Sequence, residues 1–135
     1  MSNEPILHLS LPVDNLENAR RFYFDVLGCR LGRERDDWFD AWFHGMQLTL
    51  QLRPTEVKPC EEQGVSHFGV VLRSRTDFDV LVARIDASGT QWMTRPEIHS
   101  DPALSGKFGG KLSDPSGNVI EIKFYDEVSD LLAKG

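Results

Sequence analysis

At 135 residues, with 40% hydrophobic and 27% charged residues, the chain is long enough to form one globular domain with a substantial core. Its formal net charge of −6 argues against a general nucleic-acid-binding or anionic-membrane surface. No apolar run reaches the length of a membrane span, and the start MSNEPILHLS lacks the features of a signal peptide. The two cysteines, Cys29 and Cys60, have no metal-type spacing, so we expect a reduced, cytoplasmic protein.

The chain contains an internal repeat. Near the N-terminus stands ILHLSLPVDNLENARRFYFDVLGCRLG, and from residue 66 comes SHFGVVLRSRTDFDVLVARIDASGTQW. Each segment opens with a short apolar strand that carries a histidine, and each continues into an amphipathic helix. Gly28 and Gly89 follow the two helices, where a left-handed cap is common.

The first half predicts one helix and four strands. After a strand around residues 7–11, Asp14 is expected to cap the helix, with Glu17 completing a capping-box-like pattern. Four apolar residues at helical spacing form its core stripe: Leu16, Ala19, Phe22 and Val26. Strands are then expected over Cys29–Arg35, Trp38–Phe43 and Gln47–Leu52.

The second half repeats this order after a polar linker at about residues 53–64. Its helix carries Phe78, Leu81, Val82 and Ile85, with Thr76 or Asp77 near the cap. Strands are expected over Ser66–Leu72, Thr90–Thr94, Lys107–Ser113 and Val119–Tyr125, the last two joined by a DPSGN turn. The pattern predicts a single α+β domain, residues 1–135, made of two βαβββ modules at about 5–52 and 65–125.

Strand alternation places selected polar side chains on the face opposite the helices. Leu7, Leu9 and Leu11 should face the helices, so His8 should face away from them, and the same reasoning applies to His67. Gln51 and Glu121 hold similar positions in the last strands of the two halves. A lone strand histidine is more often a core residue than a ligand. If the halves pack about a pseudo-twofold axis, however, two imidazoles and a carboxylate suffice to bind a divalent transition metal.

Three motifs resemble the vicinal oxygen chelate superfamily: HLSLPVDNLENARRFYFDVLGC, HFGVVL and DPSGNVIEIKFY. That group holds glyoxalase I, extradiol dioxygenases, and fosfomycin- and bleomycin-resistance proteins, and the resemblance covers about residues 5–126. It implies two βαβββ modules whose sheets curl around a metal bound by His8, His67 and Glu121. At the fourth position, where glyoxalase I has a glutamate ligand, the nearest match is Gln51. The resemblance also implies a homodimer and is closest to small predicted dioxygenases of the extradiol type.

These features favour a metal-dependent enzyme with dioxygenase-like chemistry on a small catechol- or hydroxyketone-like substrate. Two histidines and a carboxylate are the usual ligands of non-haem Fe(II), although Zn, Mn, Ni or Co also fit. Gln51 is expected to orient the substrate or a metal-bound water. Lys111 is a candidate proton acceptor beside His44 and His99, each of which has an ordinary structural explanation as well. A glyoxalase-like lyase or isomerase, and a non-catalytic protein that binds a small molecule or antibiotic, remain the alternatives.

Overall fold

A computed structural model describes residues 2–96, 107–125 and 132 of the chain. The chain forms two compact units. The first comprises residues up to Gly64 together with Asp114–Asn118, and the second comprises Val65–Ser113 and the residues from Val119 on. No helix among the described residues is long and apolar enough to cross a membrane.

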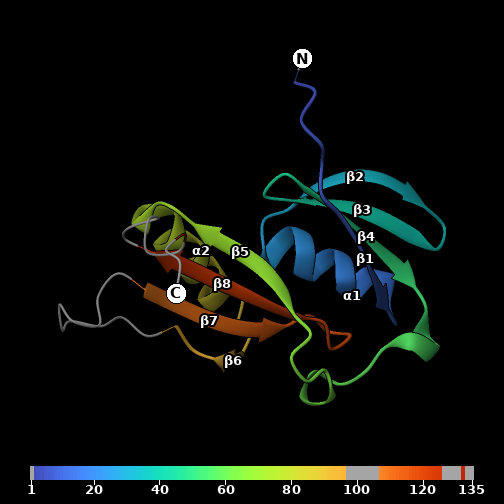
Figure 1. Cartoon of the computed structure of the whole chain (residues 1–135). Helices are drawn as coiled ribbons and strands as arrows, with labels where there is room; N and C mark the ends of the chain where they lie inside the picture. The colour runs from blue at the N-terminus through green and yellow to red at the C-terminus, as the bar shows by residue number, and fades with distance from the viewer. Residues whose placement is uncertain (1, 97–106, 126–131, 133–135) are drawn as a thin grey trace. The chain divides into compact units, whose positions relative to one another are not determined.

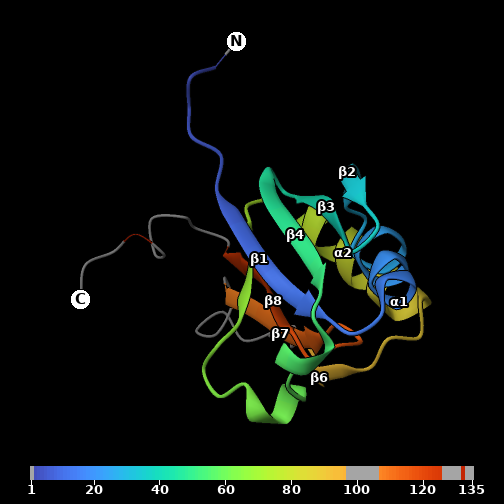
Figure 2. The same ribbon diagram turned by 90° about the vertical axis from the view of Figure 1, so that its right-hand side faces the viewer.

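The first unit is a four-stranded sheet with one helical segment on a face (Figure 1). Its sheet order is β1-β4-β3-β2, with β1 parallel to β4 and the other pairs antiparallel. Figure 2 shows β1, β4 and β3 lying side by side. The elements are β1 (His8–Val13), α1 (Leu16–Arg20), the π-helix η1 (Arg21–Val26), β2 (Arg30–Arg35), β3 (Trp38–Phe43), β4 (Met46–Leu52), and the short 3₁₀ turns η2 (Pro54–Glu56) and η3 (Cys60–Glu62).

The second unit repeats the same topology. Its sheet order is β5-β8-β7-β6, again with the first strand parallel to the last. Its elements are β5 (Phe68–Leu72), α2 (Arg75–Ala87), β6 (Trp92–Thr94), β7 (Lys107–Ser113) and β8 (Val119–Tyr125). The predicted α+β fold of two βαβββ modules is confirmed.

Alternation along the strands separates a core face from an open face in each unit. Leu48 and Leu50 are fully buried, as are Ile120 and Ile122 of β8. In β3 the buried apolar residues are Phe39, Ala41 and Phe43, which leaves Trp38 and Trp42 half-buried on the opposite face. The prediction for Leu7 is wrong: it lies before β1 begins and is 72% exposed.

Both helices begin at a different residue from the one predicted. Asn15 caps α1 by accepting a hydrogen bond from the backbone N–H of Asn18, 2.8 Å away. Asp14 instead accepts a hydrogen bond from the Ser116 hydroxyl, so its carboxylate is engaged elsewhere. Ser74 caps α2 by accepting a hydrogen bond from the backbone N–H of Asp77, two residues before the predicted Thr76 and three before Asp77. In each case the residue with extended backbone just before the helix provides the capping oxygen.

The π-helical turn η1 changes which side chains the first helical segment buries. Its wider winding brings Tyr23 and Leu27 into the core beside Phe22, while Val26 of the predicted stripe is only half-buried. Gly28 then ends the segment with a φ of +77°, a conformation that glycine adopts without strain.

The DPSGN turn connects β7 and β8 of the second unit but belongs to the first. Its central group is the Asp114 carboxylate, which is 3% exposed. One oxygen accepts from the backbone N–H groups of Ser116 and Asn118, and the other accepts from the Tyr23 hydroxyl at 2.7 Å and the Asn118 amide. Burial raises the pKa of Asp114, although these hydrogen bonds oppose the rise. Four donors on one buried carboxylate fix this turn against η1.

We predict that Tyr23→Phe lowers the free energy of unfolding by about 1.5–3 kcal/mol at neutral pH, because a hydrogen bond to a carboxylate is lost. Burial, followed by the charge and hydrogen bond of Asp114, raises the pKa of Tyr23 well above 10. The folded state therefore keeps a proton that the unfolded state loses above pH 10, so stability falls as the pH rises through that range. Denaturant unfolding of both proteins from pH 7 to 11 should show the difference shrinking above pH 10. A constant difference would contradict the prediction.

Candidate functional site

The open face of the second sheet carries a compact group of charged side chains. Glu121 and Lys123 alternate with the buried residues of β8, and the register places Lys111 of β7 directly opposite Glu121. The Nζ atom of Lys123 lies 3.1 Å from Oε1 of Glu121. The side chain of Lys111 makes no hydrogen bond or ion pair with the rest of the described chain, so its amino group is available to a ligand.

His67 faces the same group from the residue just before β5. Its Nδ1 atom lies 2.7 Å from the carbonyl oxygen of Val65, so Nδ1 carries the proton and donates it to that oxygen. The other ring nitrogen, Nε2, lies 3.5 Å from Oε1 of Glu121. In the neutral ring, therefore, a nitrogen lone pair and a carboxylate oxygen face each other, which is an arrangement that favours a cation between them.

A hollow of about 230 Å³ opens beside this pair. Its lining is made of His67, Phe68, Gly69, Val70, Val71, Glu121 and Lys123. Gly69 is required here by the backbone itself, because a Cβ atom at this position would overlap the carbonyl oxygen of Glu121. The missing side chain thus allows β5 to approach β8 closely and leaves the hollow open above Glu121.

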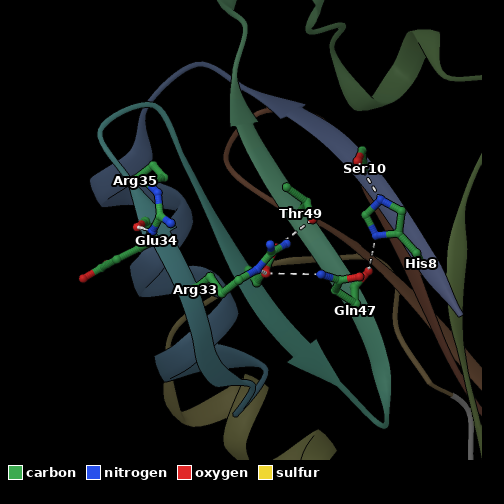
Figure 3. Close-up of polar contacts among 8 residues, drawn as sticks. His8, Ser10, Arg33, Glu34, Arg35, Gln47 and Thr49 are labelled. Carbon is green, nitrogen blue, oxygen red and sulfur yellow. Dashed lines mark hydrogen bonds and ion pairs between the residues drawn. The ribbon is translucent and has the colours of Figure 1, made fainter. Parts of the chain in front are cut away.

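His8 in the first unit also has its Nδ1 atom beside a backbone carbonyl, in this case one of the neighbouring strand β4 (Figure 3). Its Nδ1 atom lies 3.2 Å from the carbonyl oxygen of Gln47, and its Nε2 atom lies 3.3 Å from the Ser10 hydroxyl. The backbone carbonyl again fixes the proton on Nδ1, and the lone pair of Nε2 accepts a hydrogen bond from the Ser10 hydroxyl. A hydrogen bond from the other ring nitrogen to a backbone carbonyl is typical of histidines that bind metals.

The neighbours of His8 on the open face form a network around Asp40. This carboxylate is 1% exposed and accepts from the Thr49 hydroxyl at 2.7 Å, the Arg33 guanidinium at 2.8 Å and the Gln47 amide at 3.2 Å. Burial alone would raise the pKa of Asp40, but these hydrogen bonds and the charge of Arg33 lower it. The network fixes the side chain of Gln47 at the same level of the sheet as His8.

Gln51 lies apart from His8 on that sheet. The register pairs His8 with Gln47 and Pro12 with Gln51, which separates Gln51 from His8 by four residues, or about 13 Å along the strands. Gln51 borders a separate hollow of about 120 Å³ with residues of β1 and η2, and its amide makes no hydrogen bond within the described ranges. The residue beside His8 is therefore Gln47.

The other two candidate proton acceptors are His44 and His99, and the structure describes only His44. His44 lies in the two-residue turn between β3 and β4, with φ of +48°, followed by Gly45 with φ of +84°. This geometry is that of a hairpin turn and gives His44 an ordinary structural role. His99, with the long loop in which we placed it, lies outside the described residues.

A family model decides which family the chain belongs to. The model described as the Glyoxalase/Bleomycin resistance protein/Dioxygenase superfamily matches residues 5–122. The chain belongs to this superfamily. The match spans both βαβββ modules, including both strand histidines and Glu121, and agrees with the resemblance found in the sequence.

Individual superfamily members support the assignment. A catechol-2,3-dioxygenase of Bacillus subtilis (strain 168) is 29% identical over 119 residues, which is 85% of this chain and 39% of that protein. The chain thus spans about two fifths of the length of this curated relative. A glyoxalase/bleomycin resistance protein/dioxygenase from Alicyclobacillus acidocaldarius is 28% identical, with a TM-score of 0.81 over 96% of this chain and 98% of that one.

A third comparison shows the fold alone. The genomically encoded fosfomycin resistance protein of Listeria monocytogenes has a TM-score of 0.71 over 91% of this chain and 94% of that chain, at 13% identity. The superfamily fold is therefore shared by proteins named for different activities, and the specific activity of this member has to be argued from its side chains.

The candidate metal ligands lie in both units of the chain. Within each unit, the described residues contain no group of three His, Cys, Asp or Glu side chains that could hold a metal ion. The second unit does bring two donors together, His67 and Glu121. Their separation of 3.5 Å fits ligands of one metal, because donors about 2.1 Å from a metal lie about 3.0–3.5 Å apart at octahedral or tetrahedral angles.

Sequence reasoning missed three side chains at these two faces: Gln47, Asp40 and Lys123. Alternation placed Lys123 on the open face, but lysine on an open strand face carries no signal of its own. Asp40 stands between aromatic residues in the buried strand β3, and a carboxylate in such a strand is a signal that could have been used.

We predict that His67→Ala weakens binding of Zn²⁺ at least tenfold. Loss of a residue that supports a ligand typically weakens metal binding about 10- to 100-fold, and loss of the ligand itself should cost no less. Lys123→Gln should tighten Zn²⁺ binding severalfold, because the ammonium 3.1 Å from Oε1 repels a cation there. Competition with a chromogenic chelator measures both affinities. Lys58→Gln, an exposed change of equal charge in the first unit, is the control. Parental stoichiometry and affinity in His67→Ala would contradict the assignment of this ligand.

Proposed function

We propose that the protein is a metal-dependent enzyme with extradiol-dioxygenase-like chemistry on a small chelating substrate, such as a catechol. His8, His67 and Glu121 are the proposed ligands, and Fe(II) is the favoured metal because two imidazoles and one carboxylate leave further positions open. The proposal requires these three ligands to bind one metal, either within one chain or between two subunits of a dimer.

The observation that carries this proposal is the pair formed by His67 and Glu121. His67 is fixed by its Nδ1 hydrogen bond, its Nε2 atom faces a carboxylate oxygen at 3.5 Å, and a hollow opens beside both. His8 has the same Nδ1 arrangement, as expected for a ligand in the other copy of the repeat. The similarity to a catechol-2,3-dioxygenase, at 29% identity, supports the choice of chemistry.

Different residues of the chain are proposed to have different roles around the substrate. A bound divalent metal would polarise the hydroxyl groups of a chelating diol and supply positions for the diol and O₂. Lys111, opposite Glu121, is the proposed acceptor, as a neutral amine, of the proton that the diol must lose. Gln51, about 13 Å along the sheet from His8, is proposed to contact the far end of the substrate through its amide.

The glyoxalase-like alternative needs a second carboxylate ligand in the first half of the chain. Both open-face glutamines of β4 are neutral amides, and the amide of Gln47 already donates to Asp40. A purely binding protein needs no pair of donors such as His67 and Glu121. Both alternatives remain outcomes of the experiment below.

The central prediction is that anaerobic reconstitution with Fe(II) gives one iron per site and that catechol then binds with a change in absorbance. Exposure to air should consume O₂ in proportion to ring cleavage, followed with an oxygen electrode and by product absorbance. Glu121→Gln, which removes the charge and keeps the shape, should lose iron and both signals. An iron-loaded parent that binds no catechol would overturn the dioxygenase-like proposal and favour the two alternatives.

The same titration tests Gln51. Gln51→Ala and Gln51→Glu should both keep the iron, because position 51 lies away from His8 on the sheet. Gln51→Ala should weaken substituted catechols by about 1–2 kcal/mol, the scale of one hydrogen bond, and leave catechol itself unaffected. Equal affinity for all catechols in the three proteins would leave Gln51 without a role.

We also propose that the protein is a homodimer. Several large apolar side chains are exposed in the chain taken alone, namely Ile6 at 62%, Leu7 at 72%, Leu31 at 51% and Val65 at 88%. Static light scattering should give the mass of two chains at micromolar concentration, and Leu7→Asp should shift the mass toward one chain because it places a charge at an exposed apolar position. A monomer mass for the parent would remove the proposal.

A further inference from the structure

Lys123 has a position that its ion pair with Glu121 does not account for. Both side chains are partly exposed, and ion pairs of that kind contribute little to stability. The oxygen that Lys123 contacts, Oε1, is also the one that faces Nε2 of His67. In the proposed metal site this oxygen becomes a ligand, and its attraction for the ammonium group of Lys123 is then reduced.

The charges around the hollow call for an anion once a metal is bound. Lys123 brings one positive charge to the open face and Glu121 one negative charge, while Lys111 acts there as the neutral proton acceptor. A divalent metal adds two more positive charges and binds neutral imidazoles. The local excess is opposite in sign to the net charge of −6 of the whole chain. An anionic ligand relieves this excess, whereas a neutral ligand does not.

The space beside Lys123 is open toward one neighbouring strand. The register pairs Lys123 with Gly109 of β7 and with Val71 of β5, whereas Gly69 of β5 lies opposite Glu121. A Cβ atom at Gly109 would lie 3.7 Å from Cγ of Lys123, an ordinary contact, so glycine is not required there by packing. The glycine has no side chain, so a gap of about one methyl group lies beside the stem of Lys123, whose side chain also lines the hollow.

We propose that Lys123 is a specificity-determining residue that binds a carboxylate on the substrate, placed next to the substrate's chelating oxygens. The inference rests on the proposed function, which supplies the metal and the chelating diol. Because Nζ of Lys123 is only one hydrogen bond from Oε1 of Glu121, a carboxylate held by Lys123 lies beside the ligand atoms. A carboxylate on the far side of an aromatic ring cannot reach it. The substrate class is therefore an ortho-carboxylated catechol.

Three probes of known structure test this: catechol, 2,3-dihydroxybenzoate and 3,4-dihydroxybenzoate. The two acids have the same atoms and charge and differ only in whether the carboxylate adjoins the hydroxyl pair. Isothermal titration of the anaerobic Fe(II)-loaded full-length protein measures the affinity for each probe without any turnover. The parent is expected to bind 2,3-dihydroxybenzoate about tenfold or more tightly than 3,4-dihydroxybenzoate, the effect of a charge-assisted hydrogen bond.

Variants of Lys123 assign this preference to its charge. Lys123→Gln should reduce the ratio of the two affinities at least fivefold, and Lys123→Arg, which keeps the charge, should retain most of it. Lys58→Gln, which changes the net charge equally at an exposed site in the first unit, should leave the ratio at the parental value. Iron content measured on every protein separates an effect on the ligand from an effect on the metal.

The outcomes distinguish a failure of the proposed role of Lys123 from a failure of the proposed function. A parent that holds iron and binds catechol, with an isomer ratio that Lys123→Gln leaves unchanged, overturns the role of Lys123 and leaves the proposed function standing. A preference for 3,4-dihydroxybenzoate in the parent also overturns it. A parent that holds iron and binds none of the three probes overturns the proposed function, and this inference with it.

Discussion

The parallel pairing of the first and last strands in each unit is the constraint on which the candidate site depends. A parallel pair cannot be closed by a tight turn, so the helix and two further strands of each module form the connection between its members. As a result, β5 and β8 are neighbours although most of the module separates them in sequence. This pairing brings the imidazole of His67 to the carboxylate of Glu121, and the equivalent pairing in the first unit brings His8 to Gln47.

Two buried carboxylates, Asp114 and Asp40, organise the structure of the first unit. Asp114 binds the Tyr23 hydroxyl on η1 and the N–H groups of its own turn, and Asp40 binds three side chains on the open face. Both carboxylates are almost inaccessible to water, so each relies on a complete set of donors. The opposite pKa shifts reflect this balance: burial prevails at Asp114, whereas hydrogen bonds and the Arg33 charge prevail at Asp40.

Much of the fold could be predicted from the sequence, because its signals are periodic. Alternation identified the buried residues of β8, such as Ile120 and Ile122, and therefore placed Glu121 on the open face. The strand bounds of β3, β7 and β8 agree with the prediction, since apolar and aromatic runs bounded by turn residues define them. The repeat of a histidine in two matching strands also pointed to the residues that the structure holds by equivalent Nδ1 hydrogen bonds.

Features that depend on register or on competition between partners could not be predicted. Alternation gives Gln47, Thr49 and Gln51 the same face, but only the pairing of β1 with β4 shows that Gln47 adjoins His8. Asp14 and Asn15 are both good caps, and the choice is made by Ser116, far away in the sequence. The π-turn that buries Tyr23 has no sequence pattern of its own.

Gly69 illustrates how a position can be intolerant of change without being buried. It is exposed, and by the usual criteria of surface location a substitution there would be considered harmless. Its backbone, however, approaches the carbonyl oxygen of Glu121 so closely that even alanine would force the two strands apart. Among homologues, or in a library of random variants, this surface position should therefore vary as little as a catalytic residue. Its invariance would then report the spacing of two strands and not a direct role in chemistry.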